Sequence, residues 1–340
     1  MPDSEIALAP TTPWTLRLFA WAHVPPIWVG LGISAVWFAF YLLYTTVLVE
    51  GPDRYWLSEL GWSLLIGMAP AVTAASLRGS ARDLEDLAPA LRASPAEIEA
   101  LRREIATVPR SLLTAVGVGM AVLTATAVFH ERTMDSGRVA ALGDSAMVWY
   151  IGRNVVNFWL ISRALTIELS LARAFSRLGA RLPAVDVVDR TPLAPFGRRG
   201  LRSVLLWMLY LSLFSWQYAL GAARPELGGV LLLVVSIAIA AFLLPVWGAH
   251  LRLREAKATE LSRVRARIGE LRKRALTAPP GIVVGGRLTD LISWEQRVAS
   301  GGEWPFSGST VLRFGLYTAI GLGSWLGAAF VERLLESALR

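Results

Sequence analysis

The chain has 340 residues, of which 54% are hydrophobic and 18% are charged, and its mean hydropathy is +0.48. Soluble domains are typically about 45–50% apolar and about 25% charged, so this composition excludes an ordinary soluble domain. The formal net charge is +8, and the excess Lys and Arg lie in a few blocks between long uncharged runs.

Few residues are available for metal binding or covalent catalysis. The chain has no cysteine, which excludes disulfides, thiolate metal sites and cysteine nucleophiles. Its histidines are His23, His130 and His250, and no two share a helical turn as zinc sites of the HExxH type require. The apolar runs also contain no nucleophile–base pair. We therefore predict that the protein is not an enzyme and has neither a cofactor nor a metal.

Long apolar runs recur along the chain. A helix needs about 20 mostly apolar residues to cross a bilayer core. Six such runs carry few or no charges. A seventh, 146–171, holds Arg153, Arg163 and Glu168 but is otherwise apolar and aromatic. The sequence thus predicts an all-α, polytopic membrane bundle of seven transmembrane helices. Besides 146–171, the predicted spans are residues 27–49, 60–77, 111–129, 203–223, 228–249 and 310–331.

The basic residues orient these spans. The segments after the second, fourth and sixth spans hold 6, 7 and 11 Lys or Arg, whereas the intervening loops hold 1, 2 and 1. Short loops rich in Lys and Arg stay in the cytoplasm. We therefore predict a cytoplasmic N-terminus, an outward C-terminus and a multi-pass protein of the plasma membrane, or of the inner membrane of a bacterium. The charge excess then needs no nucleic-acid partner.

The same patterns divide the chain into four parts. Pro13 to Ala22 is interpreted as a short interfacial helix, with no cleavable signal peptide. The parts are a leader (1–26), a six-helix membrane region (27–249) with cytoplasmic helical loops at 78–110 and 172–202, a cytoplasmic helical layer with a re-entry segment (250–309), and a final span with a short outer tail (310–340).

The cytoplasmic segments have helical patterns. Ser94 to Glu97 forms a capping box that begins an amphipathic helix. Another helix is expected from His250 to about Leu276, and a second amphipathic piece over 287–299. Two interpretations stay open: these helices cap the bundle and bind anionic headgroups, or the first forms an intersubunit bundle. Its heptad-like stripe is Leu261, Val264, Ile268, Leu271 and Ala275.

Polar residues within the spans are the candidate site. At about 100° per residue, several polar residues of the fourth span share one stripe, and the fifth span has a milder matching face. The stripes line a ligand cavity, or Arg153 pairs with a neighbouring helix while Glu168 extends to the inner surface. The candidate cavity residues are Tyr150, Arg153, Asn154, Asn157, Glu168, Tyr210 and Gln217.

The final span has a different character. Gly323 and Gly327 form a small-xxx-small pair that lets helices approach closely. This helix serves close packing or lines a pore around a symmetry axis. Arg313 lies near its start, and Glu332 would form part of a charged outer mouth that selects ions.

In its order of segments the chain resembles insect odorant and gustatory receptors. The shared features are seven spans, a sixth span that continues into the cytoplasm, an amphipathic piece at 287–299 and a terminal span at 310–331. The family's Thr-Tyr and Gln-Phe motifs are not present, and Leu316-Tyr317 stands where a Thr-Tyr pair would. The resemblance implies a homotetrameric, ligand-gated cation channel.

Further stretches, 185–189 with 192–202 and, separately, 303–306, look similar to an uncharacterised prokaryotic membrane family to which no activity is attached. Three functions therefore stay open: a channel, a small-molecule transporter, and a non-conducting scaffold or sensor with a basic partner-binding layer. The expected partners are the lipid bilayer, further copies of the chain (a tetramer in the channel case) and a small-molecule ligand of unknown identity.

Overall fold

The computed structural model confirms the all-α class. All regular structure among the described residues is helical. The described residues are 16, 18–19, 24–48, 56–106, 108–136, 145–183, 185–219, 227–277, 285–306, 308–320 and 323. The α-helices are α2 (Pro26–Leu48), α3 (Trp56–Leu91), α4 (Pro95–Ala106), α5 (Arg110–Ser136), α6 (Ser145–Ala180), α7 (Ala194–Ala219), α8 (Leu227–Thr277) and α9 (Gly285–Ser300), with a 3₁₀ turn η1 (Thr191–Leu193) before α7. Residues 308–320 form a further helix, here called the final helix.

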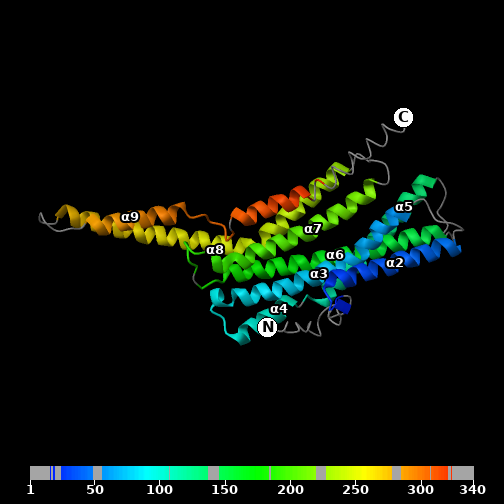
Figure 1. The fold of residues 1–340 in the computed structure, drawn as a ribbon, viewed down its shortest axis with the longest axis horizontal. Helices are drawn as coiled ribbons and strands as arrows, with labels where there is room; N and C mark the ends of the chain where they lie inside the picture. Colours follow the sequence, from blue (N-terminus) through cyan, green and yellow to red (C-terminus); the bar gives the residue numbers. More distant parts are fainter. Residues whose placement is uncertain are drawn as a thin grey trace.

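The helices form an elongated bundle from which the α8–α9 hairpin projects at one end (Figure 1). At 1.5 Å per residue the 51 residues of α8 are about 75 Å long, so this helix passes through the bundle and beyond it. The described parts of the segments rich in Lys and Arg, 78–110, 173–202 and 252–297, gather toward this end (Figure 1). We call it the basic end; the opposite end is the outer end.

Five of the described helices are long and apolar enough to cross a membrane, which fits a multi-pass membrane protein. The predicted spans 203–223 and 310–331 both extend into residues outside the described part, so a total of seven spans stays a prediction. The five candidate spans are Pro26–Val47, Trp56–Leu91, Pro95–His130, Met147–Ala180 and Ser236–Arg274.

Several helices run further than the predicted spans. α3 continues through Pro70 and Pro89, and α8 passes through residue 249 without a break. The chain beyond the apolar runs is rich in Ala, Leu, Arg and Glu, which favour helix as strongly as the runs themselves. The division placed after residue 249 therefore falls inside a continuous helix, because the membrane boundary is not a helix boundary.

The predicted capping box is confirmed. The backbone N–H of Ser94 donates to Glu97 Oε2 at 2.7 Å, and the backbone N–H of Glu97 donates to Ser94 Oγ at 3.3 Å. The apolar side of α4 then packs into the largest core cluster, at the basic end, through Ile98 and Ile105. Phe19 belongs to this cluster too. Leu16 and Phe19 are thus part of the core there, whereas most of residues 13–22 lie outside the described part.

Close helix contacts depend on glycine. A Cβ on Gly248 of α8 would lie 1.7 Å from the Ser176 carbonyl oxygen of α6, and one on Gly67 of α3 would lie 2.1 Å from the Gly30 carbonyl oxygen of α2. Small residues at such positions let the helix backbones approach closely. These two contacts help to fix α2, α3, α6 and α8 relative to one another.

Candidate functional site

The first polar cluster joins α6 to α3 near the outer end. Arg153 Nη1 donates to Glu59 Oε2 at 2.6 Å, and the two side chains are only 9% and 3% exposed. The guanidinium also lies over the rings of Trp62 and Tyr150, 5.0 and 4.7 Å from their centroids. Arg153 thus has the neighbouring-helix partner that one interpretation expected, and cation–π contacts add to the stabilisation of its charge.

The asparagines of the predicted stripe bond along their own helix. Asn154 Nδ2 donates to the Tyr150 carbonyl at 2.8 Å, and Asn157 Nδ2 donates to the Arg153 carbonyl at 3.1 Å. Both asparagines are buried. Their amide nitrogens thus stabilise α6 locally, while the buried Asn157 Oδ1 has no hydrogen-bond partner in the structure.

A second cluster lies closer to the basic end and joins three helices. Arg199 of α7 donates to Glu168 Oε2 of α6 at 2.6 Å, and the side chains are 0% and 3% exposed. Arg199 Nη1 also donates to Ser76 Oγ of α3 at 3.1 Å and to Ser203 Oγ at 2.9 Å. Glu168 therefore does not extend to the inner surface as one interpretation expected, because Arg199 compensates its charge inside the bundle.

The single stripe predicted on α6 becomes two separate clusters. Fifteen residues divide Arg153 from Glu168, which is about 22 Å along a helix. Tyr210 is buried on α7 with its ring 5.8 Å from that of Trp207. The side chain of Gln217 lies outside the described part. The structure thus joins Tyr150 with Arg153, and Glu168 with Ser203.

A third cluster fixes the start of α7 at the basic end. Asp83 of α3 accepts from Arg198 Nε at 3.1 Å and from Arg202 Nη2 at 2.6 Å. Asp86 also pairs with Arg198. With Arg199, three arginines in the first turns of α7 bind carboxylates of α3 and α6, so these charges set the register of the three helices.

Sequence reasoning missed Glu59, Arg199 and Asp83 as partners. Glu59 lies just outside the predicted span 60–77, and Arg199 lies in the predicted cytoplasmic segment 172–202. One signal was present: Glu59 and Glu168 are acids within or beside apolar runs, where an unpaired charge is costly. Each therefore required a basic partner, but its identity depends on which helices are neighbours.

The final helix packs on the bundle through one side only. Phe314 contacts Phe242 of α8, with centroids 4.7 Å apart, and Tyr317 packs in the same cluster. On the other side, Gly308, Gly315 and Gly323 have no atom within 4 Å of where a Cβ would stand. Arg313 is exposed as well. Gly327 and Glu332 lie outside the described part.

This uncovered side has a regular composition. Gly315, Ala319 and Gly323 recur every four residues, and Gly327 continues the series in the sequence. At about 100° per residue they share a face with Leu312, whose residue is 73% exposed. We call Gly315, Ala319, Gly323 and Leu312 the small-residue face.

The segment that precedes the final helix is held against α8. His250 stacks on Trp304 with centroids 4.0 Å apart, and its Nδ1 lies 2.8 Å from the Glu303 carbonyl oxygen. Lys257 Nζ donates to the Gly301 carbonyl at 2.7 Å. Residues 301–304 thus connect the α8–α9 hairpin to the final helix through defined contacts.

The hairpin itself covers part of the predicted heptad stripe. α9 packs along α8, Val264 and Val298 are buried, and Arg265 pairs with Glu295 at 2.7 Å. Leu261, Ile268 and Leu271 are half-buried. Part of the stripe is therefore used within one chain rather than left for a second copy. The side chain of Ala275 lies outside the described part.

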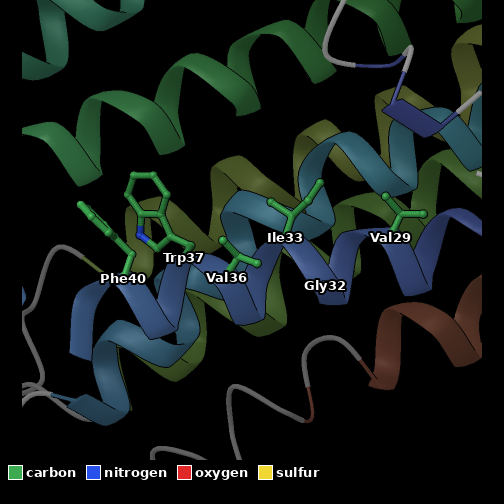
Figure 2. A pocket seen from close by; sticks show the side chains of 6 residues that line it. All are labelled: Val29, Gly32, Ile33, Val36, Trp37 and Phe40. Carbon is green, nitrogen blue, oxygen red and sulfur yellow. The ribbon is translucent and has the colours of Figure 1, made fainter. Parts of the chain in front are cut away.

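An apolar groove of about 670 Å³ runs along α2 (Figure 2). It is lined by Val29, Gly32, Ile33, Val36, Trp37 and Phe40. A groove of this kind suits hydrocarbon and offers no ionisable side chain for chemistry. Within the described part of the chain, no three His, Asp or Glu side chains are placed to hold a metal ion.

Comparison of the chain with protein-family models, with curated proteins and with solved structures finds no match. The likeness to insect chemoreceptors therefore stays a prediction.

Proposed function

We propose that the protein is a homo-oligomeric channel of the membrane, in which the final helices of several copies meet through the small-residue face. One observation carries this proposal: the helix turns Phe314 and Tyr317 toward its own bundle and leaves its glycines uncovered. A lipid-facing helix gains nothing from glycine, whereas a helix interface gains close backbone approach.

The final helix lies at the edge of the bundle (Figure 1), where it can meet the final helices of other copies and line a path for ions. Copies arranged around an axis would bring the uncovered faces together and line a narrow path between them. Arg313 would lie at its basic end and the acidic residues near Glu332 at its outer end. An acidic ring at a mouth attracts cations, so the expected permeant ions are cations.

The absence of cysteine makes this geometry directly testable. Leu312→Cys places a thiol on the small-residue face, and Val36→Cys places one on α2. Val36→Cys is the matched control for Leu312→Cys, because Leu312 and Val36 are 73% and 72% exposed and both are apolar. Under mild oxidation in proteoliposomes we expect a disulfide-linked dimer of the Leu312→Cys protein and none of the Val36→Cys protein. Equal crosslinking of the two, or none at Leu312→Cys, contradicts the proposed interface.

Conduction needs its own measurement. The wild-type protein in proteoliposomes should pass K⁺ or Na⁺ down a gradient, and disulfide formation by Leu312→Cys should change that flux. A chain that is strictly monomeric in nanodiscs, as measured by native mass spectrometry, contradicts the channel. Uptake of a small molecule against its gradient would instead support a transporter.

The alternative is a non-conducting scaffold or sensor that binds a partner through the basic hairpin. The observation in its favour is the exposed basic surface there: Arg263, Arg265 and Arg267 have side chains that are 73%, 63% and 67% exposed. An assembled protein without ion flux in proteoliposomes would favour this function.

A further inference from the structure

We propose that Arg163 of α6 binds the carboxylate of a long-chain carboxylic acid that enters from the bilayer. This site would lie at the seam of α5 and α6, away from the final helix, and it does not depend on the channel proposal.

Arg163 stands apart from the other charged residues inside the bundle. Arg153 and Arg199 each hold a carboxylate at 2.6 Å, and both are buried. Arg163 is half-buried, and among the described residues no carboxylate forms an ion pair with it. Its guanidinium instead lies over the ring of Trp159, 4.9 Å from the centroid.

The position of this charge along the helix is unusual. Arg163 lies in the middle of the candidate span Met147–Ala180. Side chains of a helix tilt toward its N-terminus, and Trp159 is one turn in that direction. The charge is thus directed away from the basic end, where headgroups and water would solvate it. Ionisable residues within a membrane-spanning helix usually serve a ligand or an ion path.

The ring of Trp159 is held in place by close packing against α5. A Cβ on Gly117 of α5 would lie 2.6 Å from the Trp159 indole nitrogen, so this ring is seated directly against the α5 backbone. On other faces of α5, the apolar side chains of Val118, Val122 and Leu123 are 54%, 58% and 61% exposed. The site therefore combines a guanidinium that lies over a tryptophan ring with a neighbouring helix whose exposed side chains are apolar and suit a hydrocarbon chain.

Several possible anions do not fit this position. A phospholipid phosphate lies at the edge of the bilayer core, about 15 Å from its centre. Inorganic anions do not enter hydrocarbon. The buried acids of the candidate spans are Glu59, Asp83 and Glu168, and in a second copy all three are already paired with arginines of their own chain.

A long-chain carboxylic acid can reach this position, lie against apolar side chains and pair with the guanidinium. Its neutral form dissolves in hydrocarbon, its chain can lie along α5, and its carboxylate matches the paired N–H groups of a guanidinium. Arg is better suited than Lys to this role because it offers a planar, two-point contact.

The test is equilibrium binding of palmitate to the full-length protein in phosphatidylcholine nanodiscs. We expect saturable binding that Arg163→Gln weakens about ten- to hundredfold, since hydrogen bonds to charged groups are among the stronger ones. Arg163→Lys should bind with intermediate affinity. Arg173→Gln is the matched control, because Arg173 is exposed on the same helix at the basic end, and it should bind like the wild type.

Ligand chemistry gives a second test that needs no variant. Methyl palmitate and acetate should not compete with palmitate, since the first lacks the charge and the second lacks the chain. The proposal is overturned if methyl palmitate competes, or if an anionic phospholipid competes more strongly than palmitate. It is also overturned if Arg163→Gln binds palmitate like the wild type, if Arg173→Gln loses as much affinity as Arg163→Gln, or if the wild type shows no saturable binding. If Arg163→Gln fails to fold, as judged by its unfolding temperature, the competition experiments alone decide.

Discussion

Arg199 and Glu168 form a 2.6 Å ion pair at the centre of the three-helix contact of α3, α6 and α7, and Arg199 is completely buried. Two hydroxyls complete its surroundings, from Ser76 and Ser203. A buried pair of this kind is costly to break but not necessarily costly to replace, because the penalty comes from leaving one charge alone.

This asymmetry gives the first prediction. Arg199→Leu and Glu168→Leu should each lower the free energy of unfolding by about 3–5 kcal/mol, whereas the double variant should recover a large part of that loss. Denaturant unfolding of the four proteins in detergent measures the coupling. Additive losses would mean that the two charges do not compensate each other in the folded protein.

The second prediction concerns two glycines of α8. Gly248→Ala should disrupt the contact of α6 with α8, since its Cβ would meet the Ser176 carbonyl oxygen at 1.7 Å. Gly269→Ala is the matched control on the same helix, where nothing lies within 4 Å. There alanine should stabilise the helix by about 0.5–1 kcal/mol.

Unfolding temperatures of the two variants, measured under one detergent condition, check this contrast. An unchanged or raised unfolding temperature for Gly248→Ala would show that the helices can move apart at no cost.

The third prediction concerns the contact of His250 with the segment before the final helix. His250→Ala removes both the stack on Trp304 and the hydrogen bond at the Glu303 carbonyl, whereas His250→Phe keeps an aromatic ring. Amide hydrogen exchange over 301–320 should be fastest in His250→Ala and intermediate in His250→Phe. Exchange rates that match the wild type in both variants would mean that other contacts hold this segment.

The fourth prediction is a pH dependence at the turn before α7. Hydrogen bonds from the Thr191 hydroxyl and from its backbone N–H, at 3.0 Å, lower the pKa of Asp189 below its ordinary value of 3.8. A lowered pKa means that the ionised carboxylate stabilises the fold above the ordinary value, and that this contribution disappears as the pH falls through the lowered one.

Unfolding of the wild type and of Asp189→Asn should therefore differ at neutral pH and converge at acidic pH. Asp186→Asn is a useful comparison, since Asp186 accepts from the backbone N–H groups of Val188 and Asp189 in the same turn. A difference between wild type and Asp189→Asn that persists at the lowest pH would contradict the role of the charge.

The sequence by itself determined the local structure. Hydropathy and length predicted α2, α5 and α6 as long apolar helices, the Ser94–Glu97 pair predicted the start of α4, and the periodicity of 287–299 predicted α9. These features depend only on residues within a few helical turns of one another, so the sequence alone is enough to predict them.

Only the tertiary structure decided which charges meet. Glu59 and Arg153 are 94 residues apart, and Glu168 and Arg199 are 31 apart, so their pairing depends on which helices are neighbours. The same holds for the uncovered face of the final helix, since the glycines are visible in the sequence but the side that α8 covers is not. Helical periodicity orients each helix about its own axis, whereas long-range packing selects its neighbours and hence the partner of every buried charge.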